Sequence, residues 1–85
     1  MRKMTVKVNV AALRRAGFDP RVTQNGEPGS VKLVAEDPGF ATPAGRPQVI
    51  LMDIRVPDDW KPGEWGWNVA PDSTDDELVI ELECL

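Results

Sequence analysis

The sequence predicts an α+β fold in which a small, mainly antiparallel β-sheet of four to five strands carries one short helix near the N-terminus. Two observations support this prediction. Apolar and polar residues alternate over residues 4–10 and again over 78–84, which is the period of a half-buried strand. Residues 11–16 are good helix formers, and Gly17 tolerates the left-handed conformation that ends many helices. A chain of 85 residues is expected to form a single domain, residues 1–85.

The middle of the chain is expected to hold a hairpin, a loop and a buried strand. Residues 21–24 and 31–36 have strand character, and the Asn, Gly and Pro residues between them are typical of a turn. Residues 37–47 contain three prolines and two glycines, which indicates a loop. Residues 49–56 begin as a continuous apolar run, which predicts the central strand of the sheet, covered on both faces in its first half. A small barrel made only of strands is the alternative architecture.

All three tryptophans, Trp60, Trp65 and Trp67, lie within eight residues of the chain. Exposed together, they would form an apolar patch of roughly 450 to 750 Å², so they belong either to the core or to an interface. They occur in a long connection, residues 58–77, and such connections are commonly functional. We expect Trp60, which follows the central strand, to anchor the core. Trp65 and Trp67 share parity, so we expect them to be displayed together from a turn rich in Pro and Gly.

Composition argues against most catalytic chemistry. The chain has no histidine and a single cysteine, Cys84, which excludes an internal disulfide, a nucleophile activated by histidine and the common zinc sites. It also has no phosphate-binding loop. Carboxylates alone can hold Mg²⁺ or Ca²⁺, but their spacing matches no calcium-binding loop, so a carboxylate-metal enzyme is the least favoured function. We expect no catalytic residue, no metal and no cofactor.

The expected location is the reducing cytoplasm, since one cysteine gives no reason to invoke an oxidising compartment. The N-terminus alternates polar and apolar residues where a secretory signal would be continuously apolar. No segment approaches the ~20 apolar residues that span a bilayer. We therefore expect no membrane partner.

Charge is distributed unevenly along the chain. Residues 1–42 carry seven basic and four acidic side chains (+3), whereas residues 43–85 carry three basic and ten acidic ones (−7). An acidic half steers a protein toward basic surfaces, although a merely solvated acidic face is the plain alternative. The negative net charge and the absence of a DNA-binding motif argue against direct contact with nucleic acid.

Protein binding explains the tryptophans and the carboxylates together, because tryptophan is favoured at the centre of interfaces and charge selects the partner. Glu81 and Glu83 would lie about 6.6 to 6.8 Å apart along a strand, a spacing from which a mimic of a nucleic-acid backbone can be built. Their alternative role is the solvent face of an edge strand. The expected partner-binding residues are Trp65, Trp67, Asp58, Asp59, Asp72, Asp75, Asp76, Glu77, Glu81 and Glu83.

As a type, this short, acidic, histidine-free and loop-rich chain resembles the small inhibitors of phages and mobile elements, and among these it is similar to anti-CRISPR proteins. The resemblance covers the whole chain and shares no residue pattern, so it assigns no residue. It implies a stoichiometric inhibitor that docks on a basic surface of a nucleic-acid-handling protein, such as a CRISPR effector or its nuclease, and blocks it. A structural or assembly role, including a homodimer formed through the tryptophans, is the alternative function.

Overall fold

The structure, a computed structural model, describes residues 2–24 and 28–85 and confirms the α+β class. It has six strands in this part of the chain instead of the expected four to five, and the strand that the sequence did not reveal is β5. Part of the expected turn after residue 24 falls on residues 25–27, outside the described residues. The elements in chain order are β1 (Arg2–Asn9), α1 (Ala11–Arg15), β2 (Arg21–Thr23), β3 (Ser30–Glu36), β4 (Gln48–Arg55), β5 (Trp65–Val69) and β6 (Glu77–Cys84).

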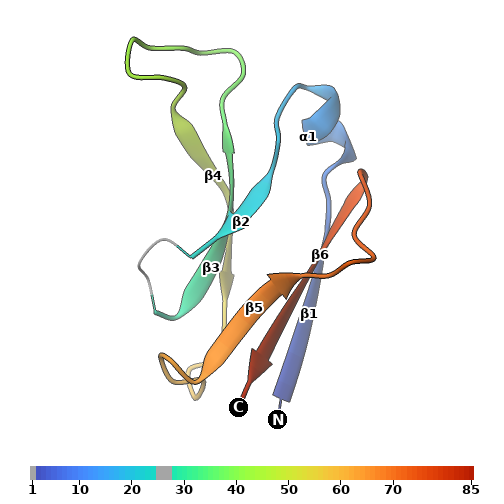
Figure 1. The fold of residues 1–85 in the computed structure, drawn as a ribbon, viewed down its shortest axis with the longest axis vertical. Helices are drawn as coiled ribbons and strands as arrows, with labels where there is room; N and C mark the ends of the chain where they lie inside the picture. Colours follow the sequence, from blue (N-terminus) through green and yellow to red (C-terminus); the bar gives the residue numbers. More distant parts are fainter. Residues whose placement is uncertain (1, 25–27) are drawn as a thin grey trace.

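The strands form two antiparallel, three-stranded sheets rather than one (Figure 1). In the first sheet β6 lies between β1 and β5, and in the second β3 lies between β2 and β4. β1 and β6 pair along their whole length, with Arg2 opposite Cys84 and Asn9 opposite Glu77. The first and last strands of the chain are therefore neighbours, and both chain ends lie at the same end of the first sheet (Figure 1).

The central strand of the second sheet is β3, so the prediction that residues 49–56 form a central strand is wrong. β4 lies at the sheet edge, where Ile50 and Met52 are 61% and 39% exposed. The register between β3 and β4 shifts beside Leu33, which marks a β-bulge. A bulge lets consecutive residues face the same side, so an unbroken apolar run in β4 does not require cover on two faces. By contrast, every residue of β3 from Ser30 to Ala35 is buried.

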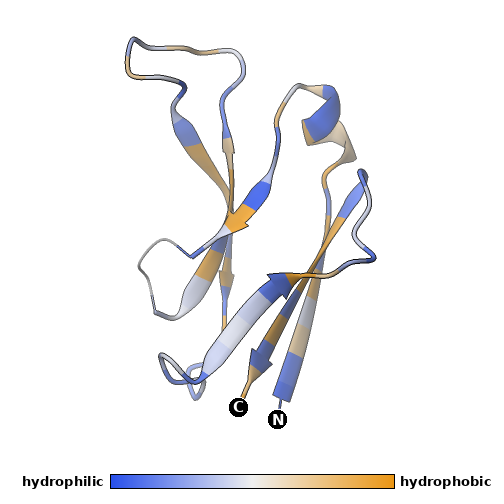
Figure 2. Cartoon of the chain, viewed as in Figure 1, coloured by the Kyte–Doolittle hydropathy of each residue, from blue (hydrophilic) through white to orange (hydrophobic). Residues whose placement is uncertain are grey.

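The core lies between the two sheets, and Figure 2 shows apolar segments on the strands of both. The second sheet contributes Val31 and Ile54, and the first contributes alternate residues of β6. This alternation in β6 was predicted from the sequence and is confirmed. Its buried apolar members are Leu78, Ile80, Leu82 and Cys84, but Val79 on the opposite face is buried as well, so that face is acidic only at its other positions.

The short helix α1 closes one end of the core, where Leu13 packs against the buried cluster of Val10, Leu33 and Leu78. Asn9 Oδ1 accepts a hydrogen bond from the backbone N–H of Ala11 at 3.0 Å and so satisfies one N–H at the helix start. Gly17 follows the helix with φ of +93°, as the sequence predicts. No helix in the described ranges has the length and apolar character needed to cross a bilayer.

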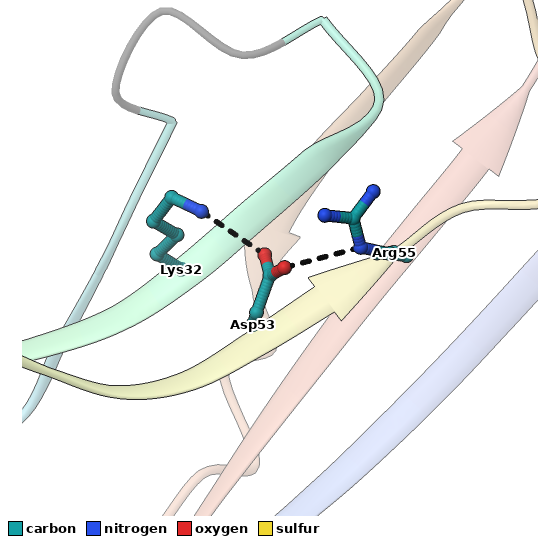
Figure 3. Close-up of polar contacts among 3 residues, drawn as sticks. All are labelled: Lys32, Asp53 and Arg55. Atoms are coloured by element: carbon teal, nitrogen blue, oxygen red, sulfur yellow. Dashed lines mark hydrogen bonds and ion pairs between the residues drawn. The ribbon is translucent and has the colours of Figure 1, made fainter.

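An ion-pair network joins the two longer strands of the second sheet (Figure 3). Lys32 Nζ lies 3.2 Å from Asp53 Oδ1, and Arg55 Nε lies 3.2 Å from Asp53 Oδ2. Lys32 and Asp53 are directly opposite each other in the register, and only 11% of the Lys32 side chain is exposed. The hydrogen bond from Lys32, together with the charges of Lys32 and Arg55, holds the pKa of Asp53 below its ordinary value.

Acid is expected to weaken the fold in part by protonating Asp53. Because the folded state lowers the pKa of this carboxyl, its contribution to stability is complete above the ordinary aspartate value of about 4 and is lost as the pH falls through the lower folded value. Asp53→Asn should therefore lower the melting temperature at about pH 7 and flatten its fall between about pH 5 and pH 2. Thermal unfolding followed by circular dichroism at each pH measures both effects.

Asp58→Asn is the control for this experiment, because Asp58 forms no ion pair with any other described residue. It should leave the melting temperature at neutral pH close to that of the unmodified protein. An Asp53→Asn profile that runs parallel to the unmodified protein at all pH values would contradict the prediction.

Candidate protein-binding surface

β5 positions Trp65 and Trp67, and it does so in a strand rather than on the turn from which the sequence predicted their display. Trp65 lies opposite Cys84 and Trp67 opposite Leu82, so the two indoles share one face, as their parity indicated. Both are half-buried and pack against the core. Trp65 Nε1 also donates a hydrogen bond to the carbonyl oxygen of Pro28 at 3.2 Å, which links β5 to the turn that precedes β3.

Trp60 is the core anchor that the sequence predicted, and only 4% of it is exposed. The guanidinium of Arg2 lies 5.6 Å from the centre of the Trp60 ring, within the range of a cation–π contact. A tight turn then leads into β5, with a 3.0 Å hydrogen bond from the backbone N–H of Glu64 to the carbonyl of Lys61 and with Gly63 at φ of +81°. This turn fixes where β5 begins and so where Trp65 and Trp67 lie.

The edge of β5 borders a shallow hollow of about 340 Å³. Both half-buried tryptophans and Glu83 line it, and Gly66 lies between them in the strand. A smaller hollow of about 120 Å³ shares Asn68 and Glu83 with it and extends to Glu81 on the outer face of the first sheet. Lys3 of β1 also lines the smaller hollow. From the lining of the two hollows we define the β5 edge surface by six residues of β5 and β6: Trp65, Gly66, Trp67, Asn68, Glu81 and Glu83.

Glu81 and Glu83 lie on the outer face of β6, where Glu81 is exposed and Glu83 is half-buried. β6 is the inner strand of its sheet, so the alternative that places them on an edge strand is wrong in the position of the strand. Glu81 is flanked by Thr5 of β1 and by Asn68 of β5, whose amide nitrogen lies 3.5 Å from its carboxylate. Glu83 lies opposite Lys3 on the β1 side and opposite Gly66 on the β5 side. The carboxylate of Glu83 is therefore open toward the β5 edge.

Asp58 and Asp59 belong to the segment that follows β4, and this segment lies at the end of the molecule that carries the chain termini (Figure 1). Asp59 lies 2.8 Å from Arg2, and the hydrogen bond from this guanidinium lowers the pKa of Asp59. Asp58 is exposed and lines a hollow of about 240 Å³ with Arg55 and the buried Trp60. Of these two carboxylates, only Asp58 is without an ion-pair partner in the described ranges.

The other four carboxylates predicted to bind a partner lie in the turn between β5 and β6 and at the first position of β6; we call this segment, residues 72–77, the acidic turn. Thr74 shapes it, since its Oγ1 accepts a hydrogen bond from the backbone N–H of Glu77 at 3.1 Å, and Ser73 Oγ accepts one from the N–H of Val79 at 3.0 Å. All four are exposed, and none pairs with a basic residue in the part of the chain that the structure describes. They are Asp72, Asp75, Asp76 and Glu77.

The predicted partner-binding residues thus form two separate groups rather than one surface. β6 begins at Glu77 and ends at Cys84, and a strand of eight residues spans roughly 25 Å at about 3.3 Å per residue. Asp58, Asp59, Glu83 and the tryptophans lie toward one end of this strand, and the acidic turn lies at the other. A small partner site can therefore meet one group but not both.

Sequence reasoning missed two members of the β5 edge surface, Gly66 and Asn68. The signal was present in the order Trp65, Gly66, Trp67, Asn68 and Val69, in which large apolar and small or polar residues alternate as in a strand. The glycine, the preceding Pro and Gly residues and the shortness of the segment favoured a turn instead.

Aromatic faces beside a carboxylate attract ammonium and guanidinium groups, and an open strand edge offers backbone hydrogen bonds to a peptide. At the β5 edge surface the indoles of Trp65 and Trp67 lie on the core side of the strand and Glu83 lies on the outer side, so these features flank the open edge from opposite faces. In the described ranges, no group of three or more Cys, Asp or Glu side chains is placed to hold a metal ion. Comparisons with protein families, with characterised proteins and with solved structures give no match to this chain.

Proposed function

We propose that this protein is a non-enzymatic inhibitor that acts in the cytoplasm. It docks through the β5 edge surface on a basic region of a nucleic-acid-handling protein and blocks that protein. The observation that carries the proposal is the hollow of about 340 Å³ at the open edge of β5, which Trp65, Trp67 and Glu83 line. Tryptophan contributes strongly where interfaces are well packed, and a neighbouring carboxylate selects a cationic partner group. The inhibitory role follows from the resemblance to small phage inhibitors of the anti-CRISPR type.

The acidic turn at the far end of β6 has a different part in this proposal. Its carboxylates are exposed, and charges of this kind act mainly on the rate of encounter, through a field that salt screens. We therefore assign steering to the turn and contact to the β5 edge surface. A partner whose basic surface is long enough would meet the acidic turn as well, and its nucleic-acid site would then be covered over a greater length.

Capture of partners from a host lysate tests the proposal, with mass spectrometry to identify them and purified components to measure affinity. Glu83→Lys should weaken the complex about tenfold, because it places a cation where the partner's cation would bind. Raising the salt concentration from about 0.1 to 0.5 M should also weaken the complex, since it shortens the screening length from about 10 Å to about 4 Å.

Glu77→Lys is the matched control, since it makes the same charge change at the other end of the same strand. It should slow association while changing the affinity less than Glu83→Lys does. A complex indifferent to salt and to Glu83→Lys would contradict the proposal. Recovery of the protein with copies of itself alone would support the assembly role instead.

A further inference from the structure

Gly66 lies in the interior of β5 although nothing in the fold requires a glycine there. Its φ is not in the left-handed region, and a Cβ built on it would meet no atom within 4 Å. A glycine inside a strand is destabilising by about 0.5–1 kcal/mol relative to alanine and often marks a place where another backbone or a ligand approaches closely. The open space over Gly66 therefore points to a bound group that lies outside this chain.

Among the described strands, none pairs with β5 on the side away from β6. On the β6 side, the carbonyl of Glu64 accepts a hydrogen bond from Leu85, and the N–H of Ala70 donates one to Val79. In an antiparallel pair the hydrogen-bonding residues alternate, so the backbone groups of Trp65 and Trp67 face the free edge. A further strand can pair with these groups without disturbing any backbone hydrogen bond that joins residues 2–24 and 28–85.

A strand added at this edge would bring its side chains to Glu83 across Gly66. Neighbouring strands lie about 4.7–4.9 Å apart, so a residue opposite Gly66 starts roughly 10 Å from the backbone of Glu83. The long side chain of lysine or arginine covers most of that distance, and Gly66 offers no side chain in its way. The next residue on the same face would lie beside Asn68, with Glu81 beyond it.

We propose that the β5 edge binds an extended basic segment of a partner protein as an added strand, with lysine or arginine at alternate positions. The basic side chains lie on the outer face toward Glu83 and Glu81, and the intervening residues pack beside the indoles of Trp65 and Trp67. The inference rests on the proposed function and names the chemistry of the partner at the same surface. Charge complementarity selects the occupant, because Glu81 and Glu83 lie next to the edge strand, opposite Asn68 and Gly66, whereas Lys3 lies on the far side of Glu83 from β5.

A synthetic peptide with arginine at every second position and valine or threonine between is the probe. Titration into isotopically labelled protein should shift the amide signal of Gly66 and the indole signals of Trp65 and Trp67 in a saturable way. The same peptide with alternate backbone nitrogens methylated keeps its charge but loses the hydrogen bonds of an added strand. It should bind at least about tenfold more weakly.

Two variants of the protein test the role of the outer face. Glu83→Gln should weaken peptide binding about three- to fivefold, the effect of one partly exposed ion pair. Gly66→Lys should abolish binding, because its own ammonium occupies the space beside Glu83, while its melting temperature stays at or above that of the unmodified protein. Gly39→Lys makes the same change in the loop between β3 and β4, where an added Cβ has ordinary contacts, and should bind the peptide fully.

Three results would overturn the inference: equal binding of the methylated peptide, undiminished binding to a folded Gly66→Lys, or shifts confined to the acidic turn. Shifts at Gly66 that appear with protein concentration alone would also overturn it, since a second copy would then occupy the edge. The proposed function fails separately. The proposed function is contradicted if Glu83→Lys does not weaken the binding of captured partners. The strand inference alone is contradicted if Glu83→Lys weakens the binding of captured partners but the peptides do not bind at β5.

Discussion

Trp60→Ala is expected to lower the free energy of unfolding by about 3–5 kcal/mol, the usual cost of removing a buried tryptophan or phenylalanine side chain. A domain of 85 residues has roughly 4 to 13 kcal/mol of stability in total, so the variant would be marginally folded at room temperature. The effect is large because Trp60 contacts the buried cluster that joins the two sheets and also carries Arg2 on its ring. Urea denaturation followed by circular dichroism measures the loss.

Trp60→Phe is the matched control for that variant. The indole Nε1 of Trp60 is buried without a hydrogen-bond partner among the described residues, and an unpaired buried donor costs about 1–3 kcal/mol. Phenylalanine removes this donor and keeps an aromatic ring beneath Arg2, so its stability should lie within about 1.5 kcal/mol of the unmodified protein. If Trp60→Ala and Trp60→Phe were equally stable, the ring would not be anchoring the core.

Leu82→Ala is expected to cost about 2–5 kcal/mol, because Leu82 is almost fully buried in the inner strand of the first sheet. It also lies directly opposite Met4 on one side and Trp67 on the other. Removing it leaves a cavity beside the indole of Trp67, whose surroundings should become more polar. Chemical denaturation gives the stability, and a red shift of tryptophan emission reports the change near Trp67.

Leu85→Ala makes the same chemical change three positions later, where the side chain is 86% exposed. Its stability should stay within about 0.5 kcal/mol of the unmodified protein. Equal losses for the two leucine variants would contradict the burial that separates them.

The outer parts of the fold were readable from the sequence because each obeys one simple period. Alternation identified β1 and β6, and helix formers followed by Gly17 identified α1. The misreading of β4 has a physical cause, since a bulge beside Leu33 and a position at the sheet edge both break the link between an apolar run and two-sided burial. Division into two sheets depends on which strands pair, and that is decided by contacts distant in sequence.

The sequence predicted most residues of the candidate site but not how these residues are arranged in space. The parity of Trp65 and Trp67 gave their common face, and the position of Trp60 after β4 gave its role as an anchor. In the sequence, all the carboxylates of the candidate site lie in the acidic half. The sequence did not show that the length of β6 separates the acidic turn from the carboxylates near the tryptophans. The pairing of Gly66 with Glu83 required knowing that β5 exists as a strand.

The pairing of β1 with β6 has a consequence for synthesis. β1 is synthesised before β6, its hydrogen-bonding partner, and at about 5–20 residues per second the residues between them, 10–76, take on the order of 10 s. During that time Met4, Val6 and Val8 have no sheet to pack against, while the hairpin of β3 and β4 can already form. We therefore expect the apolar side of β1 to stay exposed on the nascent chain until β6 has been synthesised.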